Sequence, residues 1–232
     1  MVKKKLLLSV IMPAYNEINT IRKIIDKVKS VNIPKEIIIV DDGSTDGTKE
    51  FLQGLNDPSI KFFHYSGNVG KSYAVRTGIS HATGDIIIIQ DADLEYDPND
   101  YHKLLEPIIS GKSKVVYGTR FPNNASRPPL TNKFFLGNRL LTLLSNILYN
   151  AQITDEPTCY KVFDSKVLKS LNLKSKRFEF CPEVTAKVRK KGHKIFEVPI
   201  SYNPRSVDEG KKINWRDGVQ AVWTLIKYRF VD

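Results

Sequence analysis

The sequence predicts an α/β protein in which helices cover both faces of a mostly parallel sheet, a Rossmann-like three-layer sandwich. Short β-rich apolar runs alternate with segments of helical spacing through the first half of the chain, which is typical of βαβ units. The run Ile86-Ile87-Ile88-Ile89 is apolar on both faces, as expected of a central strand buried between helices.

The predicted elements of the first half follow one another without a linker. Strands are expected at residues 6–12, 36–40, 60–65, 85–89 and 114–117, and helices at residues 20–31, 48–55, 72–81 and 99–109. The first apolar run follows three lysines and imitates a secretory signal, but it is short and no small-residue cleavage site follows it. We therefore interpret it as a buried strand.

The second half is less regular and is expected to form a C-terminal extension of helices and strands on the same domain, residues 1–232. A loop rich in Pro, Asn and Arg is expected at residues 120–132, followed by helices at 134–149, 183–191 and the C-terminus, with strands at 158–163 and 194–198. Core packing is the favoured interpretation of the apolar face of the 134–149 helix and of Trp215 and Trp223. Contact with a membrane interface is the alternative.

Composition limits the partners of the protein. The chain has 232 residues, 41% of them hydrophobic, and no stretch approaches the roughly 20 apolar residues that a membrane-spanning helix needs. The net charge of +11 favours an anionic partner, which could be nucleic acid, acidic lipid or a phosphorylated small molecule. Cys159 and Cys181 have no partners at metal-ligand spacing, so reduced thiols are expected.

Three polar loops follow predicted strands at what should be one edge of the sheet. They are Tyr15-Asn16-Glu17, Asp41-Asp42-Gly43-Ser44 and Gln90-Asp91-Ala92-Asp93. Ligands bind outside the carboxyl ends of the strands in open parallel sheets, so three such loops together predict a binding site.

The Asp91-Ala92-Asp93 turn carries the strongest chemical signal. Two carboxylates one residue apart at a strand end can turn toward one divalent cation, and Mg²⁺ or Mn²⁺ often bridges such oxygens to substrate phosphates. The ion would neutralise charge on a departing diphosphate. An isolated Asp-x-Asp is more often a turn or cap, but the position after a buried strand, with Glu95 nearby, favours a metal site.

The ordered set of motifs resembles glycosyltransferase family 2 with a GT-A fold. The greatest similarity is to the branch of dolichyl-phosphate mannose synthase and polyprenyl-phosphate glycosyltransferases. The segments that carry the resemblance are Pro13-Ala14-Tyr15-Asn16-Glu17, Asp41-Asp42-Gly43-Ser44-Thr45-Asp46, Asn68-Val69-Gly70-Lys71, Gln90-Asp91-Ala92-Asp93-Leu94-Glu95-Tyr96 and Gly118-Thr119-Arg120.

The resemblance implies an inverting, metal-dependent transfer of a hexose from a nucleoside diphosphate sugar to a polyprenyl or dolichyl phosphate. Residues 1–119 would bind the nucleotide sugar and residues 120–232 the acceptor. The implied site residues are Pro13, Tyr15, Glu17 and Asp42 at the nucleoside; Asp91, Asp93 and Glu95 at Mg²⁺ or Mn²⁺; Lys71, Arg120, Arg139 and Arg205 at phosphates; and Asp93, Arg120 and Glu183 in catalysis.

The nature of the acceptor decides whether a general base is needed. A lipid phosphate is already anionic, whereas a sugar hydroxyl would need a base, for which Glu179 and Glu183 are the candidates. For Glu183, a role as an orienting ion-pair partner is an alternative of equal weight. Relatives often place a Ser-Lys pair shortly after the last arginine, and Gly210-Lys211-Lys212 keeps a lysine but lacks the serine.

The resemblance also implies a cytoplasmic protein, peripheral on the cytoplasmic face of a membrane, with a separate membrane protein as a further partner. A saccharide or protein hydroxyl acceptor is the alternative within this class. A nucleotidyltransferase should have a glycine-rich basic loop after the first strand, which Pro13-Ala14-Tyr15-Asn16-Glu17 is not. A non-catalytic nucleic-acid-binding module fits the charge but leaves the aspartates unexplained, so no nucleic acid partner is expected.

Overall fold

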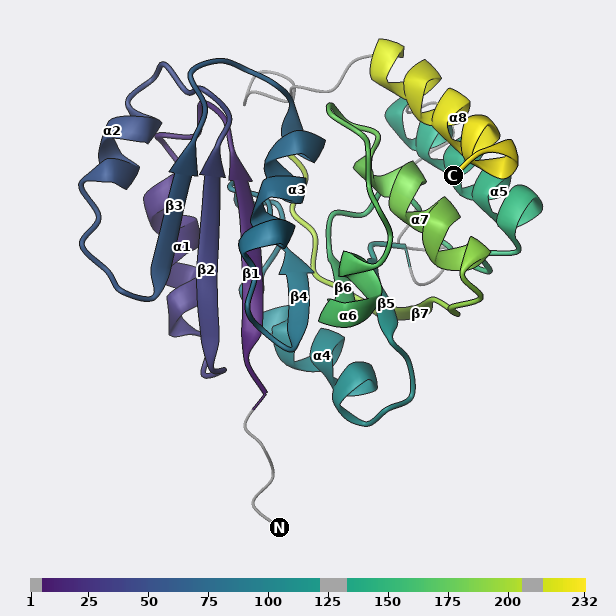
Figure 1. The fold of residues 1–232 in the computed structure, drawn as a ribbon, viewed down its shortest axis with the longest axis horizontal. Coiled ribbons are helices and arrows are strands. Elements are labelled where there is room, and N and C mark those ends of the chain that lie inside the picture. Colours follow the sequence, from purple (N-terminus) through teal and green to yellow (C-terminus); the bar gives the residue numbers. More distant parts are fainter. Residues whose placement is uncertain (1–5, 122–132, 206–214) are drawn as a thin grey trace.

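The computed structural model describes residues 6–121, 133–205 and 215–232, and its centre is one seven-stranded sheet (Figure 1). The strand order is β3-β2-β1-β4-β6-β5-β7, and β6 runs antiparallel to β4 and β5 while the other neighbours are parallel. The strands are β1 (Leu8–Ala14), β2 (Lys35–Asp41), β3 (Ile60–His64), β4 (Ile86–Ile89), β5 (Val115–Thr119), β6 (Lys161–Asp164) and β7 (Phe196–Pro199). The prediction of a mostly parallel α/β sheet is confirmed.

Helices cover both faces of this sheet, with α3 in front and α1 behind in Figure 1. Helix α1 buries Ile21, Ile24, Ile25 and Val28, which recur at spacings of three and four and so share one helical face. The helices are α1 (Ile21–Ser30), α2 (Thr48–Gln53), α3 (Lys71–His81), α4 (Tyr101–Ile109), α5 (Lys133–Tyr149), α6 (Ser165–Lys169), α7 (Phe180–Lys190) and α8 (Trp215–Phe230), with a short 3₁₀ turn at Pro98–Asp100. Helix α6, only five residues long, lies between the predicted strand at 158–163 and the predicted helix at 183–191.

The apolar first run is a buried strand, as predicted, because all seven residues of β1 are buried. Among the described residues no helix is both long enough and apolar enough to cross a membrane. Both cysteines, Cys159 and Cys181, are free thiols.

The core interpretation of α5 and α8 is wrong for one side of each helix. The two helices pack on each other and on α7 around Leu141, Tyr149, Leu225 and Tyr228 (Figure 1). Each helix is apolar on its outer side as well, and that side is exposed because no other described element covers it. The exposed side chains are Leu136, Leu140, Leu143 and Ile147 on α5 and Trp215, Val219, Trp223, Ile226 and Phe230 on α8. We call these nine residues the apolar stripe.

Glu36 joins three strands and a turn at the amino-terminal end of the sheet. Its carboxylate accepts hydrogen bonds from Ser9 Oγ (2.6 Å), Lys61 Nζ (2.7 Å) and the Thr83 backbone N–H (2.6 Å). Burial raises the pKa of this carboxyl, but the hydrogen bonds from Lys61, Ser9 and Thr83 outweigh it and lower the pKa to about 2.

We expect Glu36→Gln to lower the free energy of unfolding by about 2 kcal/mol near neutral pH, because charge-assisted hydrogen bonds are lost. A carboxyl whose pKa is lowered by folding stabilises the fold above its unfolded pKa, and that contribution disappears as pH falls toward about 2. The gap between wild type and variant should therefore narrow between pH 6 and pH 3. Urea unfolding at both pH values measures it, with exposed Glu106→Gln as control; a gap independent of pH would contradict this assignment.

Candidate functional site

The three polar loops lie at one edge of the sheet, as predicted. Strand β1 lies between β2 and β4, and Ala14 pairs with Asp41 in register, so the loops after these strands are neighbours. Backbone and side chain of Asn16 bridge the first two loops, through Asn16 N–H to Ser44 Oγ (2.8 Å) and Thr45 N–H to Asn16 Oδ1 (2.8 Å). The first loop is thereby fixed against the second.

Asp42 holds the loop that precedes α3. Its two carboxylate oxygens accept hydrogen bonds from the backbone N–H groups of Val69 (2.8 Å) and Gly70 (2.7 Å). Burial raises its pKa, and the two N–H groups oppose that shift. Pro13 is buried in β1, and Tyr15 and Glu17 are half-buried in the loop beyond it, so all four predicted nucleoside residues lie at this edge. Their contact with a nucleoside stays a prediction.

Asp91 pairs with Lys71, the first residue of α3. Lys71 Nζ lies 2.5 Å from Asp91 Oδ1, and both side chains are half-buried. Burial raises the pKa of Asp91, but the charge and hydrogen bond of Lys71 outweigh it and lower the pKa. The structure therefore brings two predicted site residues together and keeps Asp91 ionised.

A buried glutamine, for which the sequence motifs implied no role, supports this turn. Gln90 Oε1 accepts hydrogen bonds from Tyr101 Oη and Tyr160 Oη, both at 2.7 Å, and Gln90 Nε2 donates to the Asp91 carbonyl at 3.0 Å. All three side chains are buried. The signal in the sequence is a polar residue directly after four isoleucines, because a buried amide must find partners.

Arg205 binds three carboxylates. Its Nη2 lies 2.8 Å from Asp93 Oδ2, its Nη1 lies 3.3 Å from Glu17 Oε2, and its Nε lies 3.5 Å from Glu95 Oε1. Glu95 also accepts hydrogen bonds from the Arg205 backbone N–H (2.9 Å) and from Tyr202 Oη (3.2 Å). We call Arg205 with Glu17, Asp93 and Glu95 the carboxylate clamp.

Asp93 lies close to other carboxylates. Burial, and then the nearby charge of Asp91, raise the pKa of Asp93 to about 7, although Arg205 opposes the shift. Asp93 therefore sits where a further positive charge would be strongly favourable.

A complete metal site is not preassembled. Among the residues that the structure describes, no group of three or more His, Cys, Asp or Glu side chains is spaced to hold a metal ion. Asp91 faces Lys71 and Asp93 faces Arg205, so the three predicted ligands Asp91, Asp93 and Glu95 do not converge. The donor set still fits a hard divalent cation, because Asp93 and Glu95 offer carboxylate oxygens to one guanidinium and a diphosphate can supply the remaining oxygens.

Arg120 is bound to a carboxylate that the sequence analysis missed. Its Nε and Nη2 each lie 2.7 Å from an oxygen of Asp155, and both side chains are buried. The guanidinium carbon also lies 4.9 Å from the centre of the Tyr202 ring. Contact of Arg120 with a phosphate stays a prediction; one face of the guanidinium and two of its donors are already occupied in this structure.

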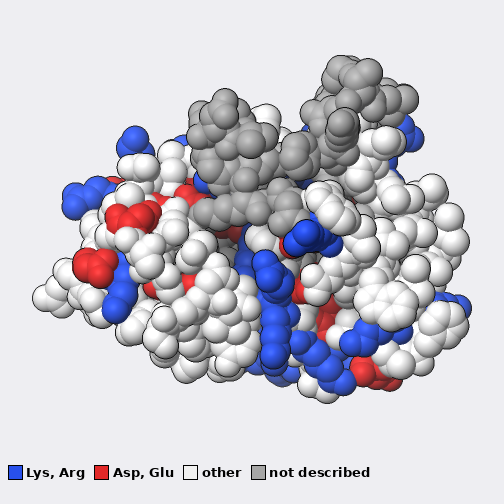
Figure 2. Space-filling view, turned by 90° about the horizontal axis from the view of Figure 1, so that it is seen from above, with Lys and Arg blue, Asp and Glu red and all other residues white. Residues whose placement is uncertain are grey.

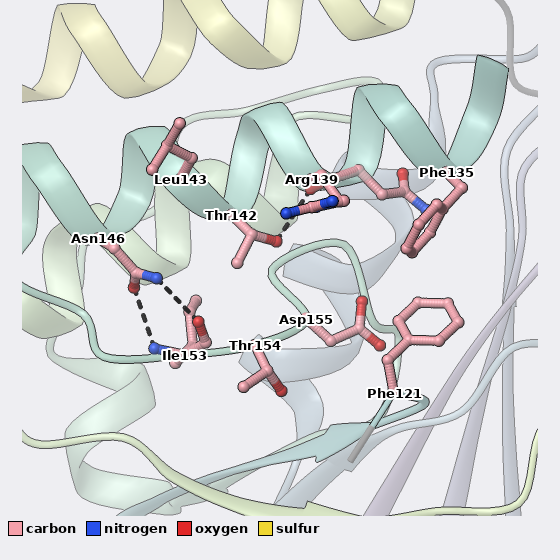
Figure 3. A pocket seen from close by; sticks show the side chains of 10 residues that line it. Phe121, Phe135, Arg139, Thr142, Leu143, Asn146, Ile153, Thr154 and Asp155 are labelled. Carbon is pink, nitrogen blue, oxygen red and sulfur yellow. Dashed lines mark hydrogen bonds between the residues drawn. The ribbon is translucent and has the colours of Figure 1, made fainter. Parts of the chain in front are cut away.

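Arg139 lies in a separate hollow beside that ion pair. Figure 3 shows Arg139 on α5 above a loop that carries Asp155. The hollow has a volume of about 200 Å³ and combines polar groups with apolar walls. It is lined by Phe121, Phe135, Asn138, Arg139, Thr142, Leu143, Asn146, Ile153, Thr154 and Asp155. We call it the α5 pocket.

Glu183 is an ion-pair partner, and its predicted catalytic role is not supported. It is fully buried in α7 and accepts hydrogen bonds from the backbone N–H groups of Lys174 (2.7 Å) and Ser175 (2.8 Å) and from Lys187 Nζ (2.7 Å). Glu179 is buried too and accepts from the Arg177 backbone N–H at 2.8 Å. Gly210-Lys211-Lys212 and most of the predicted 120–132 loop lie outside the described residues.

Basic side chains gather beside the first turn of α3. Ser72 N–H donates to the Arg177 carbonyl (2.7 Å) and Tyr73 N–H to the Lys176 carbonyl (2.9 Å), which brings this basic segment next to Lys71. Figure 2 shows a band of Lys and Arg side chains across the face that contains the carboxyl ends of the parallel strands. The face that carries the acidic loops thus also carries a band of basic side chains.

The chain is similar to known glycosyltransferases. The model of Glycosyl transferase family 2 matches residues 9–171. A UDP-N-acetylglucosamine–dolichyl-phosphate N-acetylglucosaminyltransferase from Methanococcus voltae is 31% identical over 230 residues, covering 89% of this chain and 90% of that protein. The dolichyl-phosphate beta-glucosyltransferase ALG5A of Trichomonas vaginalis is 29% identical, covering 95% of this chain and 72% of that protein.

Two further matches differ in the share of the matched protein that this chain covers. The hexosyltransferase Agl6 of low-salt glycan biosynthesis in Haloferax volcanii is 30% identical, and 97% of this chain matches 53% of it. Glucosyl-3-phosphoglycerate synthase from Mycobacterium tuberculosis, solved with Mn²⁺, UDP and glucosyl-3-phosphoglycerate, has a TM-score of 0.74 at 19% identity, covering 99% of this chain and 82% of that one. This likeness confirms the GT-A fold.

Proposed function

The chain belongs to glycosyltransferase family 2, and from this premise we propose that it moves a hexose from a nucleoside diphosphate sugar to a polyprenyl or dolichyl phosphate, with inversion. The relatives named for dolichyl phosphate support this acceptor class. The observation that carries the proposal is the apolar stripe beside a pocket that contains Arg139.

The α5 pocket is continuous with the apolar stripe. Leu143 belongs to both, because it lines the pocket and is 54% exposed on the outer side of α5. A lipid phosphate has a matching distribution of polarity, with an anionic head for Arg139 and a hydrocarbon chain for the stripe. The exposed charged side chains of α5 and α8 with described surroundings are basic, namely Arg139, Arg216, Lys227 and Arg229, which suits an anionic membrane surface.

A phosphate acceptor also agrees with the positions of the two candidate general bases. Glu179 and Glu183 are buried and hydrogen-bonded within the fold, so neither is placed to take a proton from a hydroxyl acceptor. A phosphate oxygen is anionic near neutral pH and can attack the anomeric carbon without a base. The new carbon–oxygen bond then forms as the bond to the diphosphate breaks, and the nucleoside diphosphate leaves with the electron pair.

In this proposal the side chains of the clamp and turn act on the leaving group. Asp93 and Glu95, with Asp91 close by, would hold Mg²⁺ or Mn²⁺, which when bound offsets the charge that develops on the departing diphosphate. Lys71 keeps Asp91 ionised and oriented. The Mn²⁺ and UDP in the related fold of glucosyl-3-phosphoglycerate synthase support this assignment.

The test is a panel of labelled donors, GDP-mannose, UDP-glucose and UDP-GlcNAc, incubated with the protein, Mn²⁺ and a polyprenyl phosphate. We expect label in the organic phase with at least one donor, and none when the lipid is omitted. Label transferred only to a saccharide or protein would instead support a hydroxyl acceptor. No transfer from any donor under either condition would remove the proposal.

The apolar stripe should bind membranes. Leu140→Ser and Trp223→Ser each remove a large side chain from the apolar stripe. Leu140 is 49% exposed and Trp223 is 61% exposed. Because burying such a side chain is worth about 1.5–3 kcal/mol, we expect each change to weaken binding to anionic vesicles about tenfold. Sedimentation with phosphatidylglycerol vesicles measures the effect.

The matched control is Ile109→Ser, which removes an equally exposed apolar side chain, 58% exposed, at the end of α4. It should leave vesicle binding unchanged. Equal losses for all three variants would mean that the stripe is not the membrane contact.

A further inference from the structure

The carboxylate clamp places a cation where the proposed function requires a metal ion. One guanidinium, that of Arg205, contacts Glu17, Asp93 and Glu95, although these residues are far apart in the sequence. Its side chain is 20% exposed, so the ion pairs are shielded from solvent on most sides. Arg205 therefore occupies the carboxylate oxygens that an incoming ion would need.

The fit of the guanidinium in the clamp is imperfect. Arg205 Nε is buried and makes no hydrogen bond within the described part of the chain, since its nearest carboxylate oxygen, on Glu95, is 3.5 Å away. Nη2 lies 2.8 Å from an oxygen of Asp93, and Nη1 lies 3.3 Å from an oxygen of Glu17. Within the described ranges, one guanidinium is thus shared among three carboxylates. A guanidinium held in this way can leave the carboxylates for acceptors that bind it more strongly. Phosphate oxygens are such acceptors for arginine.

We propose that Arg205 is an exchangeable counter-ion that couples metal binding to nucleotide binding: it blocks the clamp against free metal and moves to the diphosphate when metal and nucleotide arrive together. The inference rests on the proposed function, because it assumes a divalent ion at Asp93 and Glu95. The exchange makes and breaks no covalent bond. Its consequence is that the protein selects the metal–nucleotide complex over either component alone.

The coupling has a measurable form. The ratio of the Mn²⁺ dissociation constants without and with nucleoside diphosphate should be large in the wild type, because the nucleotide removes the competing guanidinium. In Arg205→Gln, Mn²⁺ should bind at least tenfold more tightly without nucleotide, since the competitor is gone. Binding with nucleotide should gain little, so the ratio should fall at least tenfold.

The experiment is a titration of Mn²⁺ against the full chain, with free Mn²⁺ measured by its EPR signal, in the absence and presence of UDP or GDP. Arg22→Gln is the charge control, because Arg22 is exposed on α1 five residues after Glu17 and lies outside the clamp. It removes one positive charge nearby, so it should shift both dissociation constants equally and leave the ratio unchanged. An unchanged ratio in Arg205→Gln would overturn the inference.

A second variant guards against misfolding of Arg205→Gln. Arg205→Met removes the competing guanidinium with a different side chain and keeps Glu17, Asp93 and Glu95, so it should also raise the affinity for free Mn²⁺ at least tenfold. No gain in that variant, in a protein with a normal thermal unfolding transition, would also overturn the inference. A wild type that binds no Mn²⁺ even with UDP and GDP would remove the metal-dependent function itself, whereas intact coupling in Arg205→Gln removes only the role of Arg205.

Discussion

Asp93→Asn is expected to lower sugar transfer by at least about 1,000-fold while the protein stays folded, because a loss of about 4 kcal/mol of leaving-group stabilisation gives that factor. Asn keeps the shape of Asp93 and removes its negative charge. The fold should tolerate the change, since burial and Asp91 raise the pKa of Asp93 to about 7 and its ionised form is disfavoured in the free protein. Initial rates at saturating Mn²⁺ and the thermal unfolding midpoint measure the two effects.

The matched control is Asp97→Asn in the same loop. Asp97 caps the short turn at Pro98–Asp100 by accepting a hydrogen bond from Asn99 N–H at 3.0 Å, and Asn is an equally good cap. This variant should retain most of the wild-type rate. Near-normal transfer by Asp93→Asn would refute the role given to that carboxylate.

Gly70→Ala is expected to lower the free energy of unfolding by about 3 kcal/mol, because two independent costs add. Gly70 has a φ of 121°, which residues with a side chain rarely adopt. A Cβ there would also lie 2.5 Å from the Lys176 carbonyl oxygen and 2.9 Å from Arg177 Cα. Since these contacts are with backbone, neither neighbour can rotate away.

Activity should fall together with stability in this variant. The first turn of α3 carries Lys71, which holds Asp91, so displacing the turn from the 176–177 backbone moves a charge in the site. Gly67→Ala is the control in the same loop, because its Cβ would meet no atom within 4 Å. We expect the free energy of unfolding of that variant to lie within about 0.5 kcal/mol of the wild-type value. Urea unfolding measures both; equal stability of the two variants would contradict the packing described for Gly70.

The sheet and its polar edge could be predicted from sequence because the signals are local. The four isoleucines of β4 identify a central strand without knowledge of any neighbour. The aspartates that follow β2 and β4 lie at one edge because both strands run parallel to β1, which lies between them.

The partners of the arginines could not be predicted, because they are long-range. Arg205 contacts Glu17 across 188 positions and Asp93 across 112 positions, and Arg120 contacts Asp155 across 35. No spacing rule links such residues. Arg120 and Arg205 were implied by the family resemblance, but Asp155 belongs to none of the motifs that carry it.

The exposure of the apolar stripe escaped prediction for a different reason. Periodicity tells which side chains share a helical face, but it does not tell what covers that face. In α5 and α8 both sides are apolar, and the outer side is exposed while the sides toward α7 and toward the other helix are buried. An apolar surface left open next to a pocket with a cationic side chain is what a lipid phosphate acceptor would require.

The most direct measurement of the central claim is a crystal structure of the protein soaked with Mn²⁺ and a nucleoside diphosphate, with data collected at the manganese absorption edge. We expect an anomalous peak within bonding distance of a carboxylate oxygen of Asp93 and of a diphosphate oxygen, with Arg205 turned to the phosphates. A bound nucleotide with no peak beside Asp93, and Arg205 still paired with that carboxylate, would contradict the account.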